Sequence, residues 1–263
     1  MHISCLMVTQ ASRFDSVRLA VADFCAQTYA TCDLLIVHDG DEVFDNALAQ
    51  WIATAPVCSA ARQRIAVHRL PGGQSLGALR NQSVQRARGE LICQWDDDDR
   101  YHPQRLALQA DKLRTADADF CFLSDQLHGF VKAKTLCWDD WDRETYPLNF
   151  VQGTLLGKRA RMPLYPEIAR GEDTGLSLDI LAAGHRITRL RHHGWCYIYN
   201  YHGSNVWDER HHQAISQAKR MPLAFVVGKS KIWRARLAEY ADLPTYHSFL
   251  AGNTQLPLIA QQY

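Results

Sequence analysis

The stretch CQWDDDDRYHP, residues 93–103, decides the interpretation of the fold, because four consecutive aspartates follow an apolar run. Like charges this close repel, and neighbouring backbone positions offer them no partner of opposite charge. In α/β sheets, ligands gather at the carboxyl ends of the strands. Aspartates at such an end are hard oxygen ligands for Mg²⁺ or Mn²⁺, and a dication offsets their repulsion. The alternative is a solvated acidic loop or a cap for the next helix.

The first 125 residues alternate between short apolar runs and segments with helical periodicity. Strands are predicted at the apolar runs 3–8, 33–38, 65–70, 91–95 and 120–123. Helices are predicted between them, at 14–25, 47–52 and 76–87, with a fourth opened by Pro103. This alternation predicts an α/β fold with a Rossmann-like, mostly parallel sheet flanked by helices.

After residue 125 the alternation stops, and residues 126–160 read as an irregular, aromatic-rich segment. A helix is predicted in RGEDTGLSLDILAAG, ending at Gly184. Two strand-like runs follow, and the chain from residue 213 is basic and amphipathic. We therefore expect one domain over 1–212, divided into a nucleotide-binding half (1–125) and an acceptor-binding half (126–212), with a helical extension over 213–263.

Composition limits the classes of function. The 29 basic and 28 acidic side chains give a net charge of +1, so the whole chain has no general attraction for nucleic acid. The N-terminus MHISCLMVTQ reads as a first strand instead of a signal peptide, and no window has the roughly 20 apolar residues that cross a bilayer. Eight cysteines without a C-x-x-C pair indicate neither a redox motif nor a zinc site. We expect a cytoplasmic protein.

Two features upstream of the aspartates point to a nucleotide. The glycine pair in PGGQSLGALR permits a close turn, after which a helix presents Arg80 near its start, where its planar guanidinium could meet a phosphate. In LLIVHDG, Asp39 and Gly40 follow the second apolar run, where a nucleoside could lie.

With these motifs in this order, the sequence resembles the inverting family 2 glycosyltransferases of the GT-A fold. The matching elements are ISCLMVTQ, LLIVHDG, LGALRNQSVQRARGE, WDDDDRYHP and RGEDTGL, and the resemblance covers roughly residues 3–205. It implies a nucleotide-sugar donor, commonly a UDP-sugar, and Mn²⁺ or Mg²⁺ bound to the donor diphosphate. The acceptor would be a hydroxyl of a glycan or lipid-linked glycan.

The resemblance assigns roles to the aspartate run. Asp96 and Asp98 are the ends of the D-x-D motif, and Asp98 is the expected metal ligand. Asp96 or Asp97 would hydrogen-bond the donor ribose or a metal-bound water. Asp99 could equally cap the following helix. Because four aspartates are consecutive, the position of the D-x-D motif in the run is uncertain by one residue.

The acidic pair of RGEDTGL would supply catalysis. Asp173 is the expected general base, taking a proton as the acceptor hydroxyl attacks the anomeric carbon, and Glu172 would support the site or orient the acceptor. His202, in YIYNYHGSNVW, is a candidate third metal ligand or phosphate contact. Aromatic side chains that could stack on an acceptor sugar are Trp138, Trp141 and Tyr146. The alternative is that the acidic pair has no catalytic role and lies in the first turn of a helix because the helix dipole favours negative charge there.

The sequence departs from the family pattern at the donor end. Thr9 is still expected to contact the nucleotide-sugar donor, but Thr9-Gln10-Ala11 replaces the usual T-Y-N-like turn. His38 stands where an acidic residue commonly precedes Asp39. The absence of Q-x-x-R-W argues against a processive synthase.

Two other functions are weighed against this one. A nucleotidyltransferase would carry a basic, glycine-rich loop after the first strand, which TQASRFD does not supply. A catalytically silent binding module would not need the acidic pair. The basic C-terminal segment is also a candidate for peripheral contact with the inner membrane face near a lipid-linked acceptor.

Overall fold

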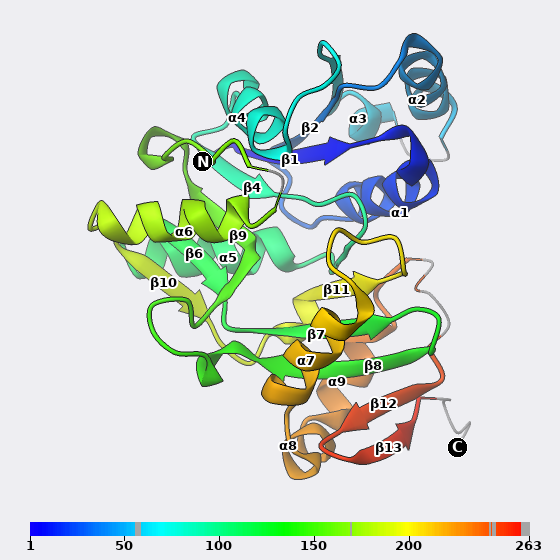
Figure 1. Ribbon diagram of the computed structural model, residues 1–263, viewed down its shortest axis with the longest axis vertical. Helices are drawn as coiled ribbons and strands as arrows, with labels where there is room; N and C mark the ends of the chain where they lie inside the picture. Colours follow the sequence, from blue (N-terminus) through cyan, green and yellow to red (C-terminus); the bar gives the residue numbers. More distant parts are fainter. Residues whose placement is uncertain (56–58, 169, 242, 244–245, 259–263) are drawn as a thin grey trace.

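Two β-sheets form the frame of the computed structural model, which describes residues 1–55, 59–168, 170–241, 243 and 246–258 (Figure 1). The first sheet has the strand order β10-β6-β9-β4-β1-β2-β3. Its strands are β1 Ile3–Thr9, β2 Cys32–His38, β3 Ile65–Arg69, β4 Leu91–Gln94, β6 Phe120–Leu123, β9 Val151–Lys158 and β10 Ile187–Leu190. Only β9 runs antiparallel to its neighbours, β4 and β6. The predicted mostly parallel sheet is therefore confirmed.

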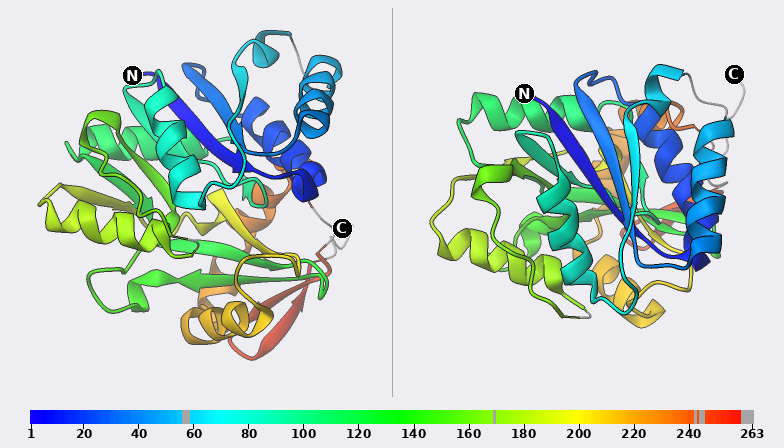
Figure 2. Two further views of the ribbon diagram at one scale, coloured as in Figure 1. Left: turned by 45° about the horizontal axis from the view of Figure 1, so that its top comes forward. Right: turned by 90° about the horizontal axis from the view of Figure 1, so that it is seen from above.

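Helices cover both faces of this sheet (Figure 2). They are α1 Phe14–Cys25, α2 Glu42–Thr54, α3 Ser59–Arg62, α4 Leu76–Arg86, α5 Arg105–Thr115 and α6 Glu172–Ala182. Alternate residues of a strand point to opposite faces, so Ile3, Cys5 and Met7 share a core with α1, α2 and α5. Leu6, between them, belongs to a second core with α4 and α6. The inner strands are thus buried on both sides, which explains their short continuous apolar runs, whereas the edge strands β3 and β10 are partly exposed.

The second sheet has the order β13-β12-β8-β7-β11-β5. Its strands are β5 Arg100–Tyr101, β7 Asp125–Phe130, β8 Thr135–Asp140, β11 Tyr197–Tyr201, β12 Ser248–Ala251 and β13 Thr254–Pro257. Helix α7 Glu209–Lys219 lies over one face, where His212 contacts His128. Helices α8 Leu223–Gly228 and α9 Ser230–Leu237 lie on the other, where Phe225 packs on Trp138 and Trp233 packs on Phe249.

The second half of the chain corrects three expectations. Residues 126–160 are not irregular, because they form most of the β7–β8 hairpin and β9. The division at residue 125 does not follow the sheets, because β9 and β10 return to the first sheet. The tail after residue 213 is not only helical, since β12 pairs with β8 and extends the second sheet. The predicted end of α6 at Gly184 is confirmed by its positive φ of 69°. No helix in the described part of the chain is long and apolar enough to cross a bilayer.

Candidate active site

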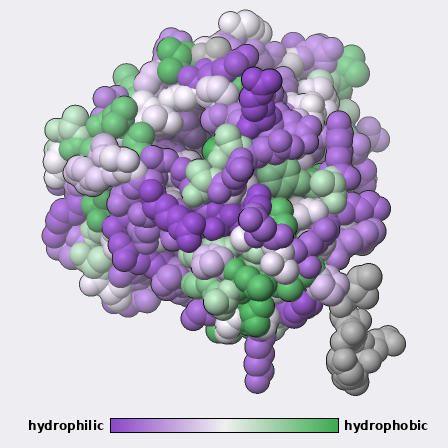
Figure 3. Space-filling model, turned by 60° about the horizontal axis from the view of Figure 1, so that its bottom comes forward, coloured by the Kyte–Doolittle hydropathy of each residue, from purple (hydrophilic) through white to green (hydrophobic). Residues whose placement is uncertain are grey.

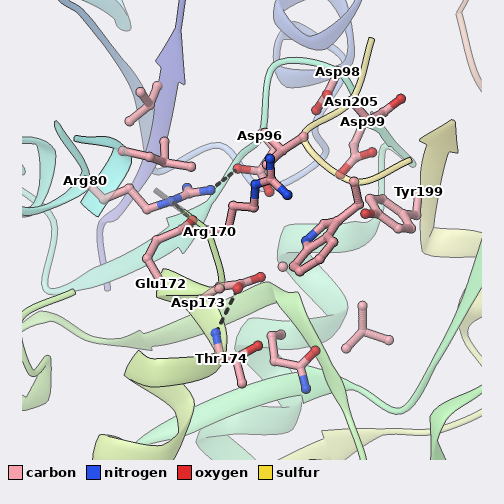
Figure 4. Close-up of a pocket in the computed structure, with 18 of the residues that line it drawn as sticks. Arg80, Asp96, Asp98, Asp99, Arg170, Glu172, Asp173, Thr174, Tyr199 and Asn205 are labelled. Atoms are coloured by element: carbon pink, nitrogen blue, oxygen red, sulfur yellow. Dashed lines mark hydrogen bonds and ion pairs between the residues drawn. The ribbon is translucent and has the colours of Figure 1, made fainter. Parts of the chain in front are cut away.

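A cavity of about 800 Å³ lies where the carboxyl ends of β1 and β4 face the second sheet. The N-terminus of α6, the start of β9, strands β7 and β11 and helix α7 also line it. All four aspartates of the run line this cavity, and so do Glu172 and Asp173. Figure 4 shows Asp96, Asp98 and Asp99 together with the acidic pair. The fold therefore brings together acidic residues that are more than seventy positions apart in the sequence.

Each aspartate of the run has different partners. The Oδ1 atom of Asp96 accepts from Nη2 of Arg80 at 2.8 Å, and its Oδ2 accepts from Nε2 of Gln94 at 2.9 Å. Asp97 accepts from the hydroxyl of Thr9 at 2.6 Å. Thr9 ends β1 and is buried, so this hydrogen bond joins the ends of the two central strands.

Asp98 is the aspartate that faces both a histidine and an arginine. Its Oδ2 lies 3.2 Å from Nε2 of His202, which follows β11, and 2.7 Å from Nη1 of Arg13. The same Nη1 is 2.8 Å from Oδ1 of Asp97. Burial would raise the pKa of Asp98, but the hydrogen bond from His202 and the charge of Arg13 lower it below the ordinary value. The pKa of Asp97 rises to about 7, because of burial and then the charge of Asp98.

Asp99 does not cap a helix, contrary to one of its two predicted roles. Its carboxylate accepts a very short hydrogen bond from the hydroxyl of Tyr197 and one of 3.0 Å from the backbone N–H of Asn200. It therefore fastens the aspartate run to β11. Burial, followed by the charges of Asp98 and Asp96, raises its pKa well above the ordinary range.

Arg80 connects the aspartate run with the acidic pair of α6. Ser75 caps α4, and Arg80 lies in its second turn, so that Nε reaches Oε1 of Glu172 at 2.9 Å while Nη2 reaches Asp96. The side chain is 9% exposed. Two carboxylates occupy two of its nitrogens, so Arg80 forms an internal bridge, and its expected contact with a donor phosphate stays a prediction.

Asp173 begins α6 beside Glu172 and lines the cavity. Its Oδ1 accepts from the backbone N–H of Thr174 at 2.8 Å. Burial, followed by the charge of Glu172, raises the pKa of Asp173 to about 6. A carboxylate with this pKa is ionised at neutral pH and accepts a proton more readily than an ordinary aspartate, as general-base chemistry requires.

At the end of β2, Asp39 lines the cavity and His38 does not. Oδ2 of Asp39 accepts from the backbone N–H groups of Gly73 and Gln74 at 3.0 and 3.2 Å, which ties β2 to the loop before α4. His38 is fully buried, and its Nε2 lies 3.0 Å from Asp45. Of these two residues, only Asp39 therefore faces the cavity.

The aromatic residues predicted to stack on a sugar lie in three different environments. Trp138 is 1% exposed and donates its indole N–H to Asp125 at 2.6 Å, so its predicted role as a sugar platform is wrong. Trp141 lines the cavity, with the Lys219 ammonium 4.7 Å from its ring centre. Tyr146 is 75% exposed and is not part of the cavity lining.

Among the cavity residues that were not predicted are Arg13, Arg170 and Trp207. Arg13 ends the short 3₁₀ helix η1 (Ala11–Arg13), which replaces the expected turn after β1. Arg170 directly precedes the GED motif and lies 5.7 Å from the ring centre of Trp207, in the loop after β11. The sequence signal for all three was proximity to a recognised motif, namely TQASR before α1, RGED before α6 and HGSNVW after β11.

A family model and solved structures resemble this chain. The model of glycosyl transferase family 2 matches residues 4–134, about half of the chain. S. aureus TarS 1-349 in complex with UDP-GlcNAc is 16% identical with a TM-score of 0.58, and the match covers 94% of this chain and 69% of that one. The mannosyltransferase PcManGT from Pyrobaculum calidifontis, in complex with GDP-Man and Mn²⁺, is 13% identical with a TM-score of 0.58, covering 93% and 77%.

Another structure of S. aureus TarS matches with 14% identity and a TM-score of 0.56, covering 82% of this chain. This chain spans only 42% of that TarS chain. None of the curated proteins matches the sequence. At these identities the solved structures establish the fold, which is the GT-A fold.

Proposed function

Because the chain belongs to glycosyl transferase family 2 and has the GT-A fold, we propose that it is a metal-dependent, inverting, non-processive glycosyltransferase. It moves one sugar from a nucleotide sugar, a UDP-sugar, to a hydroxyl of a glycan or lipid-linked glycan. One observation carries the proposal: Arg80 bridges Asp96 at the end of β4 and Glu172 at the start of α6, in a single cavity. The donor-side aspartates and the candidate base Asp173 therefore line the same cavity.

Asp173 is the general base of this proposal. It takes the proton of the acceptor hydroxyl as that oxygen attacks the anomeric carbon, on the side opposite the departing diphosphate. Its pKa of about 6, raised by burial and by Glu172, suits this role at neutral pH. Glu172 is held by Arg80 and orients the first turn of α6.

Asp98 and His202 fit a divalent ion, Mn²⁺ or Mg²⁺. They offer a carboxylate oxygen and an imidazole nitrogen 3.2 Å apart, and the Arg13 cation already lies beside the same oxygen. No cluster of three or more His, Cys, Asp or Glu residues suited to a metal occurs among the described residues. A site with two protein ligands matches an ion that completes its shell with water and substrate phosphates. When bound, the ion would offset the negative charge of the departing diphosphate.

The nucleoside end of the donor is assigned to Asp39 and Thr9, which lie at the ends of the neighbouring strands β2 and β1. Asp97 is held between Thr9 and Arg13 and would face the ribose. The TarS structure is a complex with UDP-GlcNAc and that of PcManGT is a complex with GDP-Man, so both nucleotides belong in a test.

We also propose that the protein works in the cytoplasm and touches the inner membrane face through α8 and α9. Leu223, Val227 and Ile232 are 37%, 50% and 48% exposed, and Lys231 lies exposed beside Ile232. Figure 3 shows apolar side chains gathered among hydrophilic ones on one face of the molecule. Exposed apolar side chains next to cations suit the surface of an anionic membrane.

Vesicle flotation with and without phosphatidylglycerol would test this contact. Val227→Glu should reduce binding to the anionic vesicles. Val43→Glu on α2, where the valine is 76% exposed, is the matched control and should not. Equal recovery of both variants would exclude this surface.

The proposed activity is tested with a panel of UDP-sugars and GDP-mannose in the presence of Mn²⁺. One UDP-sugar should bind in a Mn²⁺-dependent manner and release UDP slowly to water. Asp173→Asn should retain donor binding and lose turnover. If no nucleotide sugar binds with Mn²⁺ present, the proposed function fails.

A further inference from the structure

Two buried N–H donors at the second-sheet side of the cavity lack partners within the described part of the protein. They are Nε2 of Gln126 on β7 and Nε1 of Trp141 in the 3₁₀ helix η2 (Trp141–Arg143). Both residues line the cavity, and Gln126 is only 1% exposed. Leaving a buried donor without an acceptor is costly, so such groups in native proteins call for an explanation.

The two donors lie close together on one face of the sheet. Gln126 pairs with Asp139, and the backbone N–H of Trp141 donates to the carbonyl of Ser124, which extends the β7–β8 ladder by one pair. Gln126 and Trp141 are thus diagonal neighbours, with backbones about 7–8 Å apart. One sugar ring with its hydroxyl groups spans such a separation.

The surrounding groups indicate the class of ligand. Lys219 covers the ring of Trp141 and is neutralised by Glu144 at 2.5 Å. Glu144 also lines the cavity, as does Asp173. A lipid chain offers no acceptor to the two N–H donors, and Lys219, already paired with Glu144, offers no free positive charge to an anion. A neutral polyhydroxyl compound suits the N–H donors and the carboxylates alike. Its oxygens accept hydrogen bonds from the N–H groups, and its hydroxyls donate hydrogen bonds to carboxylates.

We propose that Gln126 and Trp141 form the acceptor subsite and bind a neutral pyranose through its hydroxyl oxygens. This inference rests on the proposed function, because it requires the hydroxyl-bearing ring to lie in the same cavity as the base Asp173. It changes the role expected for Trp141: the indole N–H binds the sugar, and Lys219 covers the ring.

The test uses methyl pyranosides of glucose, galactose, mannose, N-acetylglucosamine and rhamnose as probes. Their affinity is measured by calorimetry with the full chain carrying Asp173→Asn, saturated with UDP-sugar and Mn²⁺, so that the donor site is filled and no turnover occurs. At least one probe should bind. Adding Gln126→Leu or Trp141→Phe should weaken it about tenfold, while Gln85→Leu, at an exposed position of α4, should not.

Thermal stability provides a readout that a structural role would move in the opposite direction. Gln126→Leu removes a donor without a partner, so the melting temperature should stay constant or rise while probe affinity falls. A lower melting temperature with unchanged affinity would assign Gln126 to the fold and overturn the inference.

The outcomes distinguish the two proposals. If the donor binds but no pyranoside does, or if both substitutions leave pyranoside affinity unchanged, the acceptor subsite is refuted and the proposed function stands. If no UDP-sugar binds with Mn²⁺, both proposals fall.

Discussion

Replacing Arg80 with methionine should destabilise the protein strongly, because it leaves two carboxylates without their common cation. Glu172 is 5% exposed at its side chain and loses the guanidinium 2.9 Å away. Asp96 is 20% exposed and keeps the amide of Gln94. Breaking a buried pair from one side costs about 3–5 kcal/mol. Because Asp96 retains one donor and some access to water, we expect a loss near the lower end, about 3 kcal/mol.

A loss of this size is readily measured. For a chain of this length, it corresponds to a fall in melting temperature of about 6–12 °C. Methionine keeps an apolar contact with Tyr165, whose ring centre lies 5.7 Å from the guanidinium carbon, so the effect reports chiefly on charge. The matched control is Arg86→Met, at an exposed position of the same helix.

A second substitution separates the charge effect from general damage to α4. Glu172→Gln in the Arg80→Met background removes one of the uncompensated charges and should recover part of the lost stability. Thermal and urea unfolding of the four variants in this cycle measure the coupling. The reasoning is refuted if Arg80→Met destabilises no more than Arg86→Met, or if Glu172→Gln gives no recovery.

Three further predictions concern the chemistry and the core. The rate at low donor concentration should fall about tenfold per pH unit below pH 6, because Asp173, whose pKa is about 6, must be ionised to accept a proton; a flat profile from pH 7 to 5 would exclude it as the base. The pKa of Asp173 is higher in the folded protein than its ordinary value, so the protonated side chain stabilises the fold at low pH. This stabilisation is lost as the pH rises through about 6. Asp98→Asn should weaken Mn²⁺ binding, followed by electron paramagnetic resonance, by about tenfold or more, whereas Asp97→Asn should have a smaller effect; the reverse order would move the ligand by one residue. Trp138→Phe should cost about 1–3 kcal/mol, since Asp125 loses its indole donor, and should leave pyranoside binding unchanged; weaker pyranoside binding at unaltered stability would return Trp138 to the site.

The first half of the fold could be predicted because its signals are local. Runs such as Leu34–Val37 are apolar on both faces, and helices such as α4 begin at a residue that caps them, Ser75. Burial on both sides of a parallel sheet imposes these patterns on neighbouring positions. No partner from a distant segment is needed to recognise them.

The β7–β8 hairpin of the second sheet was missed because several of its buried residues are polar and have their partners in distant segments. His128 on β7 is fully buried between Asp139 of β8, at 2.8 Å, and His212 of α7, at 3.0 Å. A sequence shows the polar residue but not the group that compensates its burial. Charged and aromatic residues therefore read as an irregular segment, whereas they form the paired strands β7 and β8.

The aspartate run illustrates why residue type alone does not assign a role. Neighbouring, chemically identical side chains point in different directions, and their partners come from η1, α4 and β11. Burial raises the pKa of Asp97 to about 7 and also raises that of Asp99 well above its ordinary range, so these two hold a proton more tightly. The pKa of Asp98 is lowered instead, by His202 and Arg13 acting against burial. A metal binds only a deprotonated carboxylate. The lowered pKa keeps Asp98 ionised, and an imidazole nitrogen of His202 lies beside it. The surroundings, and not the D-x-D spacing, therefore favour Asp98 over its neighbours as the ligand.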